Sequence, residues 1–321
     1  VIQHMKLEEI QHISKRIQDN LGKVIIGKSD VIELMLTSLL ARGHILLEDV
    51  PGTGKTMLAK SLAKSINVEF NRIQFTPDLL PSDITGLNYY NQKEGDFTYR
   101  KGPVFANILL ADEINRATPR TQSSLLECME ERQVTVDGVT RKLDDPFLVI
   151  ATQNPIETAG TFPLPEAQLD RFMMQLNMGF PDYDEEIAIL NRFMNNDPIA
   201  SLEPVCEKES LISMQNLVPT IFVHSSVMDY LVQIVMKTRS HKELAQGVSP
   251  RASLAFLRAS QALAAIRGKS YVTPEIVKYL APYILSHRLI LHNSYQQGNI
   301  SKQIINDILS QVPVPTEKFS V

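Results

Sequence analysis

The chain has 321 residues, of which 44% are hydrophobic and 21% are charged, a composition typical of an ordinary soluble globular protein. A net charge of −4 disfavours a surface built to coat nucleic acid, and two cysteines are too few for a disulfide framework. No apolar run approaches the roughly 18 residues of a membrane span, and the first residues lack the apolar core of a signal peptide. These features predict a cytoplasmic protein with room for two domains.

The first part of the chain alternates between helices and apolar strands. Amphipathic spacing predicts helices over residues 6–20 and about 29–42. Residues 45–47 form a continuous apolar run, as expected for a strand of a parallel sheet that helices cover on both faces. After a glycine-containing loop, residues 57–63 have the pattern of another amphipathic helix, and residues 68–75 that of a second strand.

The loop after the first strand has the sequence Val50-Pro51-Gly52-Thr53-Gly54-Lys55-Thr56. Its glycines allow backbone N–H groups to converge on an anion, and the N-terminus of the following helix adds partial positive charge. We expect Lys55 to reach the β- and γ-phosphates of a nucleotide and the Thr56 hydroxyl to bind Mg²⁺. The pattern G-x-x-x-x-G-K-[ST] has glycine where this chain has Asp49. The alternative is a glycine turn that only joins a strand to a helix.

The next part of the chain adds three strands, a helix and two inserted hairpins. The strands and the helix are expected over residues 107–111, 120–131, 147–152 and 173–178. The hairpins are expected near residues 87–101 and 133–143, the second with the strong turn signal Asp137-Gly138. Strands that alternate with helices in this way predict an α/β domain over residues 1–181, with a mainly parallel sheet.

After Pro181 strand signals almost vanish and helical patterns take over. The expected helices cover residues 184–195, 208–217, 225–239, 250–267 and 274–291. Two of them begin with an N-cap residue followed by proline, Ser249-Pro250 and Thr273-Pro274. Pro282 is expected to kink or divide the last helix. We therefore expect a small all-helical domain over residues 182–321.

Polar residues end two of the buried strands. Asp112 and Glu113 follow one strand, and an aspartate there can hold Mg²⁺ while the glutamate acts as a general base toward water. Asn154 follows another strand and is a candidate to hydrogen-bond the attacking water or the γ-phosphate. The alternatives are a solvated strand edge for the acidic pair and an Asx turn before Pro155 for the asparagine.

Six stretches of the chain resemble the AAA+ ATPases, and most closely the MoxR family. They are LEDVPGTGKT (47–56), FTPDLLPSDITG (75–86), LADEINRA (110–117), ATQNP (151–155), LPEAQLDRF (164–172) and GVSPRA (247–252). Their order along the chain is that of the family. The resemblance implies a P-loop AAA+ core with a parallel five-stranded sheet, followed by a helical lid domain.

The resemblance also implies roles for three residues outside the phosphate loop. Asn154 matches the sensor-1 position, and Arg171 matches the arginine finger that acts on ATP held by the neighbouring subunit. Arg251 matches the sensor-2 arginine of the lid. Without the resemblance, an ordinary salt bridge is the simpler explanation of Arg171, and a solvent-facing position in the first helical turn that of Arg251. Arg116 and Arg120 stay open as other candidates for an arginine that acts in trans.

The implied nucleotide site draws on several parts of the core. Its contacts are Ile26, Val50, Pro51, Gly52, Thr53, Gly54, Lys55, Thr56, Met57 and Asp112, and Thr56 and Asp112 hold Mg²⁺ largely through water. Ile26 belongs to the region that lines the adenine pocket. The two hairpins resemble the helix-2 insert and the pre-sensor-1 hairpin, which couple the nucleotide state to a client. Four hairpin aromatic residues are either a client-contacting surface or a packing face: Tyr89, Tyr90, Phe97 and Tyr99.

The function that the resemblance implies is Mg²⁺-dependent ATP hydrolysis by a ring, expected to be a hexamer. Hydrolysis would drive chaperone-like remodelling, maturation or metal-cofactor insertion of a client protein. A protein with a von Willebrand factor A domain is a further expected partner, whereas nucleic acid is not expected. Two alternatives stay open: a nucleotide-switched binding module with little turnover, and a DNA-acting AAA+ motor.

Overall fold

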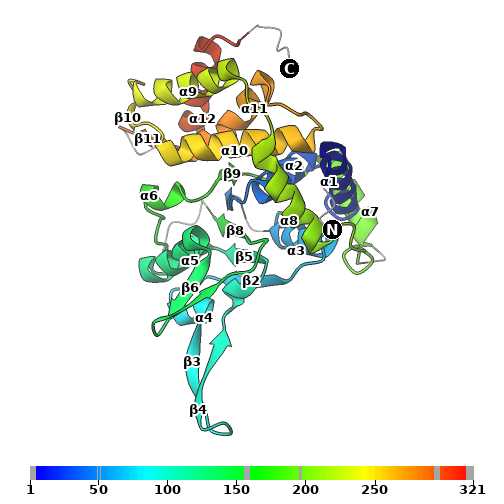
Figure 1. Cartoon of the computed structure of the whole chain (residues 1–321), viewed down its shortest axis with the longest axis vertical. Coiled ribbons are helices and arrows are strands. Elements are labelled where there is room, and N and C mark those ends of the chain that lie inside the picture. The colour runs from blue at the N-terminus through cyan, green and yellow to red at the C-terminus, as the bar shows by residue number, and fades with distance from the viewer. Residues whose placement is uncertain are drawn as a thin grey trace.

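The computed structural model describes residues 5–48, 50, 52–154, 160–194, 197–292 and 297–315. At its centre is a sheet of five strands in the order β2-β5-β8-β1-β9 (Figure 1). The strands are β1 (Ile45–Glu48), β2 (Phe70–Gln74), β5 (Ile108–Asp112), β8 (Leu148–Gln153) and β9 (Met174–Leu176). Each pair of neighbouring strands is parallel, which confirms the predicted fold class of the core.

Helices cover both faces of this sheet. The helices before and between its first strands are α1 (Leu7–Gly22), α2 (Ser29–Leu40) and α3 (Lys55–Ser65), and those that follow β2 are α4 (Pro81–Thr85) and α5 (Pro119–Glu131). Successive residues of a strand point to opposite faces. In β5, Ile108 and Leu110 therefore join the apolar cluster of α1, α2 and α3, whereas Leu109 and Ala111 join that of α4 and α5. Burial on both faces explains the continuous apolar strands.

Two hairpins stand at the predicted positions. They are formed by β3 (Gly86–Asn91) with β4 (Asp96–Lys101) and by β6 (Gln133–Val136) with β7 (Val139–Lys142). The β3–β4 hairpin extends away from the sheet at the lower end of the molecule in Figure 1. Its base is closed by Gly86 and Gly102, because a Cβ atom added to either residue would lie 2.2 Å from a backbone oxygen.

The aromatic residues of the β3–β4 hairpin divide into two groups. The Tyr99 hydroxyl donates to the carbonyl of Thr85, and its ring centroid lies 3.8 Å from the guanidinium carbon of Arg141 in β7. Tyr99 is thus a packing residue. Tyr89, Tyr90 and Phe97 are exposed. The sequence left two interpretations open. In the structure Tyr99 packs against Arg141, Tyr90 and Phe97 remain exposed although their rings meet edge to face at 5.5 Å, and Tyr89 is exposed.

The chain beyond residue 181 is mostly helical. Its helices are α7 (Tyr183–Phe193), α8 (Lys208–Leu217), α9 (Ser225–Arg239), α10 (Pro250–Ile266), α11 (Pro274–Leu285) and α12 (Gln297–Gln311). The expectation of an all-helical region was wrong in one detail, because β10 (Leu244–Gln246) and β11 (Ile290–Leu291) pair as antiparallel strands. The helix expected to reach residue 291 ends at Leu285, three residues after Pro282, and a short 3₁₀ turn, η4 (Ser286–Arg288), follows.

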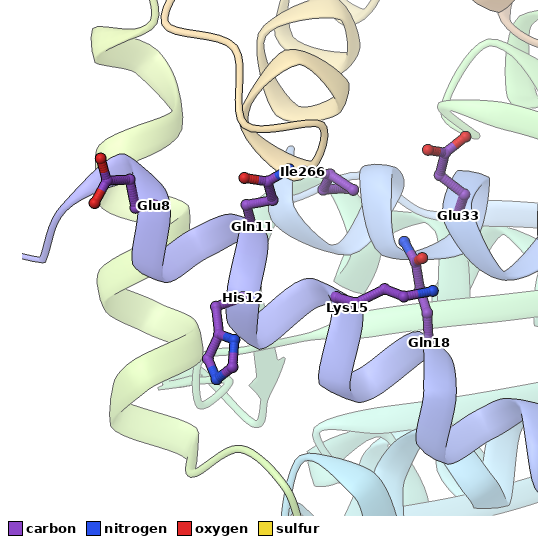
Figure 2. Close-up of a pocket in the computed structure, with 7 residues that line it drawn as sticks. All are labelled: Glu8, Gln11, His12, Lys15, Gln18, Glu33 and Ile266. Carbon is purple, nitrogen blue, oxygen red and sulfur yellow. The ribbon is translucent and has the colours of Figure 1, made fainter.

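The two N-terminal helices pack against this helical region as well as against the sheet. Both α1 and α2 contact α10. A hollow of about 340 Å³ at this junction is lined by polar residues of α1 with Glu33 of α2 and Ile266 of α10 (Figure 2). Glu33 accepts hydrogen bonds from the Arg267 guanidinium at 2.8 and 3.0 Å. Among the helices that the structure describes, none is both long and apolar enough to span a bilayer.

Candidate functional site

A cleft of about 670 Å³ lies at the carboxyl edge of the sheet. The carboxyl ends of parallel strands meet at one edge, so the residues that follow β1, β5 and β8 come together there. The predicted site residues that line the cleft are Gly52, Gly54, Lys55, Thr56, Met57, Asp112, Glu113 and Asn154. Motifs separated by up to 100 residues in the sequence thus form one site, of a size within the roughly 300–1,000 Å³ of small-molecule pockets.

The phosphate loop has a backbone that favours glycine. Gly52 and Gly54 both have a φ of +87°, in the left-handed region. Gly54 is the N-cap of α3 and has no side chain to cap the first helical turn, so backbone N–H groups of that turn are available to a ligand. The Lys55 Nζ donates to the carbonyl of Val50 at 2.8 Å, and the Thr53 hydroxyl donates to the same oxygen at 3.3 Å. Asp49 and Pro51 lie outside the described residues.

The acidic pair at the end of β5, Asp112 and Glu113, is held by a threonine that the sequence analysis did not single out. The buried Thr152 hydroxyl donates to Asp112 Oδ1 at 2.7 Å and accepts from the backbone N–H of Glu113 at 2.8 Å. Glu113 adopts a left-handed backbone conformation, with φ 56° and ψ 50°. A non-glycine residue in this region stores conformational strain, a feature that clusters at functional sites. Thr152 therefore fixes both acids from the neighbouring strand.

Both carboxylates also have cationic or amide partners inside the cleft. Asp112 Oδ2 pairs with the Arg72 guanidinium, at 2.6 Å from Nη2 and 3.1 Å from Nε. Arg72 in turn donates to Gln74 Oε1 at 2.7 Å, and Gln74 Nε2 donates to Glu113 Oε2 at 2.8 Å. The Nε of Arg116 lies 3.1 Å from the same Glu113 oxygen. Arg116 thus belongs to the cleft of its own chain, whereas Arg120 is exposed in the first turn of α5.

Two of the predicted arginines lie together at a different place. The guanidinium of Arg251, in the first turn of α10, pairs with Glu130 Oε1, and the Nε of Arg171 lies 3.2 Å from Glu130 Oε2. The Arg171 contact is one of charge, because its Nε–H is not aligned for a hydrogen bond with any described residue. The described residues that line the cleft include neither arginine, nor Ile26. Arg251 thus reaches the core but not the phosphate loop.

Sheet topology places these arginines at the opposite edge from the cleft. Arg171 precedes β9, which runs parallel to β1 with Met174 opposite Ile45. The backbone N–H of Met173 donates to the carbonyl of His44, just before β1, at 2.8 Å. Arg171 is therefore near the amino ends of both strands. The four residues of β1, which span roughly 13 Å, separate this edge from the phosphate loop.

A buried ion pair holds the segment that contains Arg171. The Arg288 guanidinium of η4 donates to Asp170 Oδ1 at 2.7 Å, and the Ser249 hydroxyl donates to Asp170 Oδ2 at 2.9 Å. Burial lowers the pKa of Arg288 to about 10, which leaves it charged at neutral pH. The sequence analysis missed Arg288. A charged residue directly before the apolar residues Leu289, Ile290 and Leu291 is the signal that was present, since arginine is almost never fully buried unless it is paired.

Comparison with known proteins gives two family matches. Residues 44–174 match the ATPase family associated with various cellular activities (AAA), and residues 236–308 match the AAA lid domain. A crystal structure of an ATPase candidate from Cytophaga hutchinsonii is similar, with a TM-score of 0.90 and 40% identity over 97% of each chain.

Two relatives are similar over almost the whole chain. The uncharacterized protein YeaC of Bacillus subtilis is 50% identical over 315 residues, which is 98% of each chain. Chaperone MoxR1 of Mycobacterium tuberculosis is 43% identical over 314 residues, 95% of this chain and 83% of that protein. The relatives, the matched AAA and lid regions and the parallel sheet agree, and the chain belongs to the MoxR family of AAA+ ATPases.

Proposed function

We propose that this protein hydrolyses ATP in the cleft at the carboxyl edge of the sheet. The observation that carries the proposal is that Lys55 and Thr56, at the uncapped start of α3, line the same cleft as Asp112 and Glu113. Backbone N–H groups and an ammonium group suit a polyphosphate, and a nearby carboxylate with a hydroxyl suits Mg²⁺, which prefers oxygen ligands. The residues present therefore fit both groups.

Each side chain then has a stated task. Lys55 and the N–H groups of residues 52–56 bind phosphate oxygens, while Thr56 and Asp112 hold the metal. Mg²⁺, when bound, neutralises the charge of the phosphates. Glu113 accepts a proton from the attacking water, which Asn154 helps to orient. Gln74 and Arg116 both contact Glu113 Oε2, so they set the direction of the carboxylate before water is bound.

Arg171 and Arg251 act on the nucleotide of a neighbouring subunit in this proposal. Their place at the amino edge of the sheet keeps them from the cleft of their own chain. When a second copy docks with its cleft against this edge, both arginines of the first copy enter that cleft. There an arginine can stabilise the charge on a transferring phosphoryl group. Such head-to-tail contacts close into rings when the rotation between subunits allows it. A hexameric ring is the proposed assembly.

The proposed work of this ring is chaperone-like. Residues 182–321 serve as a lid that moves with the nucleotide state, and the exposed Tyr89, Tyr90 and Phe97 contact a client. Similarity to a protein named chaperone MoxR1 supports this part of the proposal. Maturation of the client or insertion of its metal cofactor, with a von Willebrand factor A domain protein as a partner, is the biological role that we propose.

Phosphate release at saturating ATP tests the hydrolysis. We expect Glu113→Gln to lower kcat by about 10²- to 10⁴-fold, the range for loss of a general base, while ATP still binds in titration calorimetry. Lys55→Ala should lose the binding itself. Glu131→Gln, at an exposed position on α5, is the matched control and should equal the wild type. A wild-type rate no higher than that of Glu113→Gln would instead identify a nucleotide-switched binding module.

A further inference from the structure

We infer that Arg288, in the lid, is the residue that positions Arg171 for catalysis at the neighbouring subunit. The inference rests on the proposed trans role of Arg171. Arg288 lies 117 residues further along the chain and does not line the cleft among the described residues. It would act only through the backbone that carries Arg171.

The guanidinium of Arg288 is fully occupied. Arginine has five N–H donors, and Arg288 directs one to Asp170 Oδ1, three to the carbonyls of Asp170, Phe172 and Met173, and one to the carbonyl of Ile284 in the preceding helix α11. Three donors therefore hold backbone carbonyls on both sides of Arg171, and a fourth holds the side chain of Asp170. The side chain of Arg288 is only 2% exposed, so water cannot easily replace these bonds.

A second set of contacts joins the same segment to the start of α10. Ser249 caps α10 by accepting from the N–H of Ala252, and its hydroxyl also donates to Asp170. Two residues after Ser249, Arg251 pairs with Glu130, which Arg171 also approaches. Asp170 and Glu130 thus each connect the core to the lid. Any motion of the lid that moves η4 and the start of α10 moves Arg171 with them.

The position of a catalytic group needs this kind of support, because a displacement of about 1 Å can cost about 10²-fold in rate. Arg288→Lys keeps the charge but has three donors in place of five and no planar fork. We expect it to lower kcat by about tenfold or more. The KM for ATP should change little, because the cleft of the variant subunit is unaltered.

Mixed assemblies separate this role from a structural one. In a 1:1 mixture of Arg288→Lys with Lys55→Ala subunits, about a quarter of head-to-tail interfaces pair an intact cleft with an intact arginine, so activity should return to about that fraction. A mixture of Arg288→Lys with Arg171→Ala should not exceed the rate of Arg288→Lys alone, because both variants lack the same function. The reverse pattern, with recovery only in the second mixture, would show that Arg288 supports its own cleft and would overturn the inference.

Two controls complete the test. Arg267→Lys changes another lid arginine with a bidentate carboxylate partner and should leave kcat unchanged. The mixture of Arg171→Ala with Lys55→Ala must recover, and its failure in confirmed mixed assemblies would overturn the trans role of Arg171 itself. Circular dichroism shows whether Arg288→Lys folds. If it does not, Asp170→Asn, which keeps an acceptor for Arg288, replaces it and must recover activity with Lys55→Ala but not with Arg171→Ala.

Discussion

The two edges of the parallel sheet carry functional residues of different origin. At the carboxyl edge, short segments at the ends of four strands, β1, β2, β5 and β8, form the cleft, and each segment is continuous in the sequence. At the amino edge, the residues that contact Arg171, its partner Glu130 or the adjacent Asp170 lie far apart in the chain: Glu130, Ser249, Arg251 and Arg288. The cleft is thus built from short local segments of the sequence. The contacts around Arg171, Glu130 and Asp170, which we call the arginine junction, form only after the lid has packed against the core.

The ion pairs of the amino edge also differ among themselves. The side chains of Arg171 and Arg251 are 28% and 48% exposed, and exposed pairs contribute at most about 1 kcal/mol to folding. Breaking their ion pairs with Glu130 should therefore cost little free energy. The pair of Arg288 with Asp170 is buried and satisfied on all sides, which makes it a permanent part of the fold.

Removing one partner of the buried pair should have the largest effect on stability. Asp170→Ala leaves the Arg288 charge without its counterion, and we expect the free energy of unfolding to fall by about 3–5 kcal/mol. Glu130→Ala, the exposed counterpart, should cost less than about 1 kcal/mol. Urea denaturation monitored by circular dichroism measures both. Equal losses would remove the distinction between a permanent and an exchangeable pair.

The pH dependence of the free energy of unfolding tests a second residue at the amino edge, His44. Burial lowers the pKa of His44 to about 3, and its ring bonds to the carbonyl of Met129 and the N–H of Val149, at 3.1 and 3.0 Å. The imidazole of His44 binds a proton more readily in the unfolded chain than in the folded one. Its contribution to the free energy of unfolding is therefore complete above about pH 6.5, and it should fall by about 1.4 kcal/mol per pH unit as the pH drops toward 3.

His44→Gln offers the matched control for that titration, since an amide can make the same two bonds without binding a proton. The variant should show a slope smaller by about 1.4 kcal/mol per pH unit between pH 6 and 4. His287, whose pKa burial also lowers, contributes to both proteins alike. Identical slopes in the two proteins would mean that His44 is already protonated in the fold.

The smallest expected effect is at the carboxyl edge. Glu113 has a left-handed backbone, which costs roughly 1–2 kcal/mol for a residue with a Cβ atom. The free energy of unfolding of Glu113→Gly should thus be about 1 kcal/mol higher than that of Glu113→Ala, although we expect both variants to be inactive. Thermal unfolding of the two variants measures the difference. If alanine is tolerated as well as glycine, the strain at this residue is absent.

Most of the carboxyl edge was predictable from the sequence, and little of the amino edge was. Lys55, Asp112 and Asn154 follow apolar runs whose periodicity indicates strands, so their meeting at one edge follows from the parallel topology. Within the cleft the exceptions are Arg72, Gln74 and Thr152, since a single polar residue within or at the end of a strand has no distinctive pattern. The partners of Arg171 had to be found in the structure, because tertiary packing has no local sequence signal.

The two hairpins have a mechanical consequence. Asn88 donates to Asp137 at 2.5 Å and Arg141 stacks on Tyr99, so β3–β4 and β6–β7 form one body. Residues 75–85, which include α4, connect this body to Gln74 in the cleft, and residues 131–132 connect it to Glu130. Strands of six residues are about 20 Å long. A rotation of about 10° at the base of this body would therefore displace its tip by about 3.5 Å.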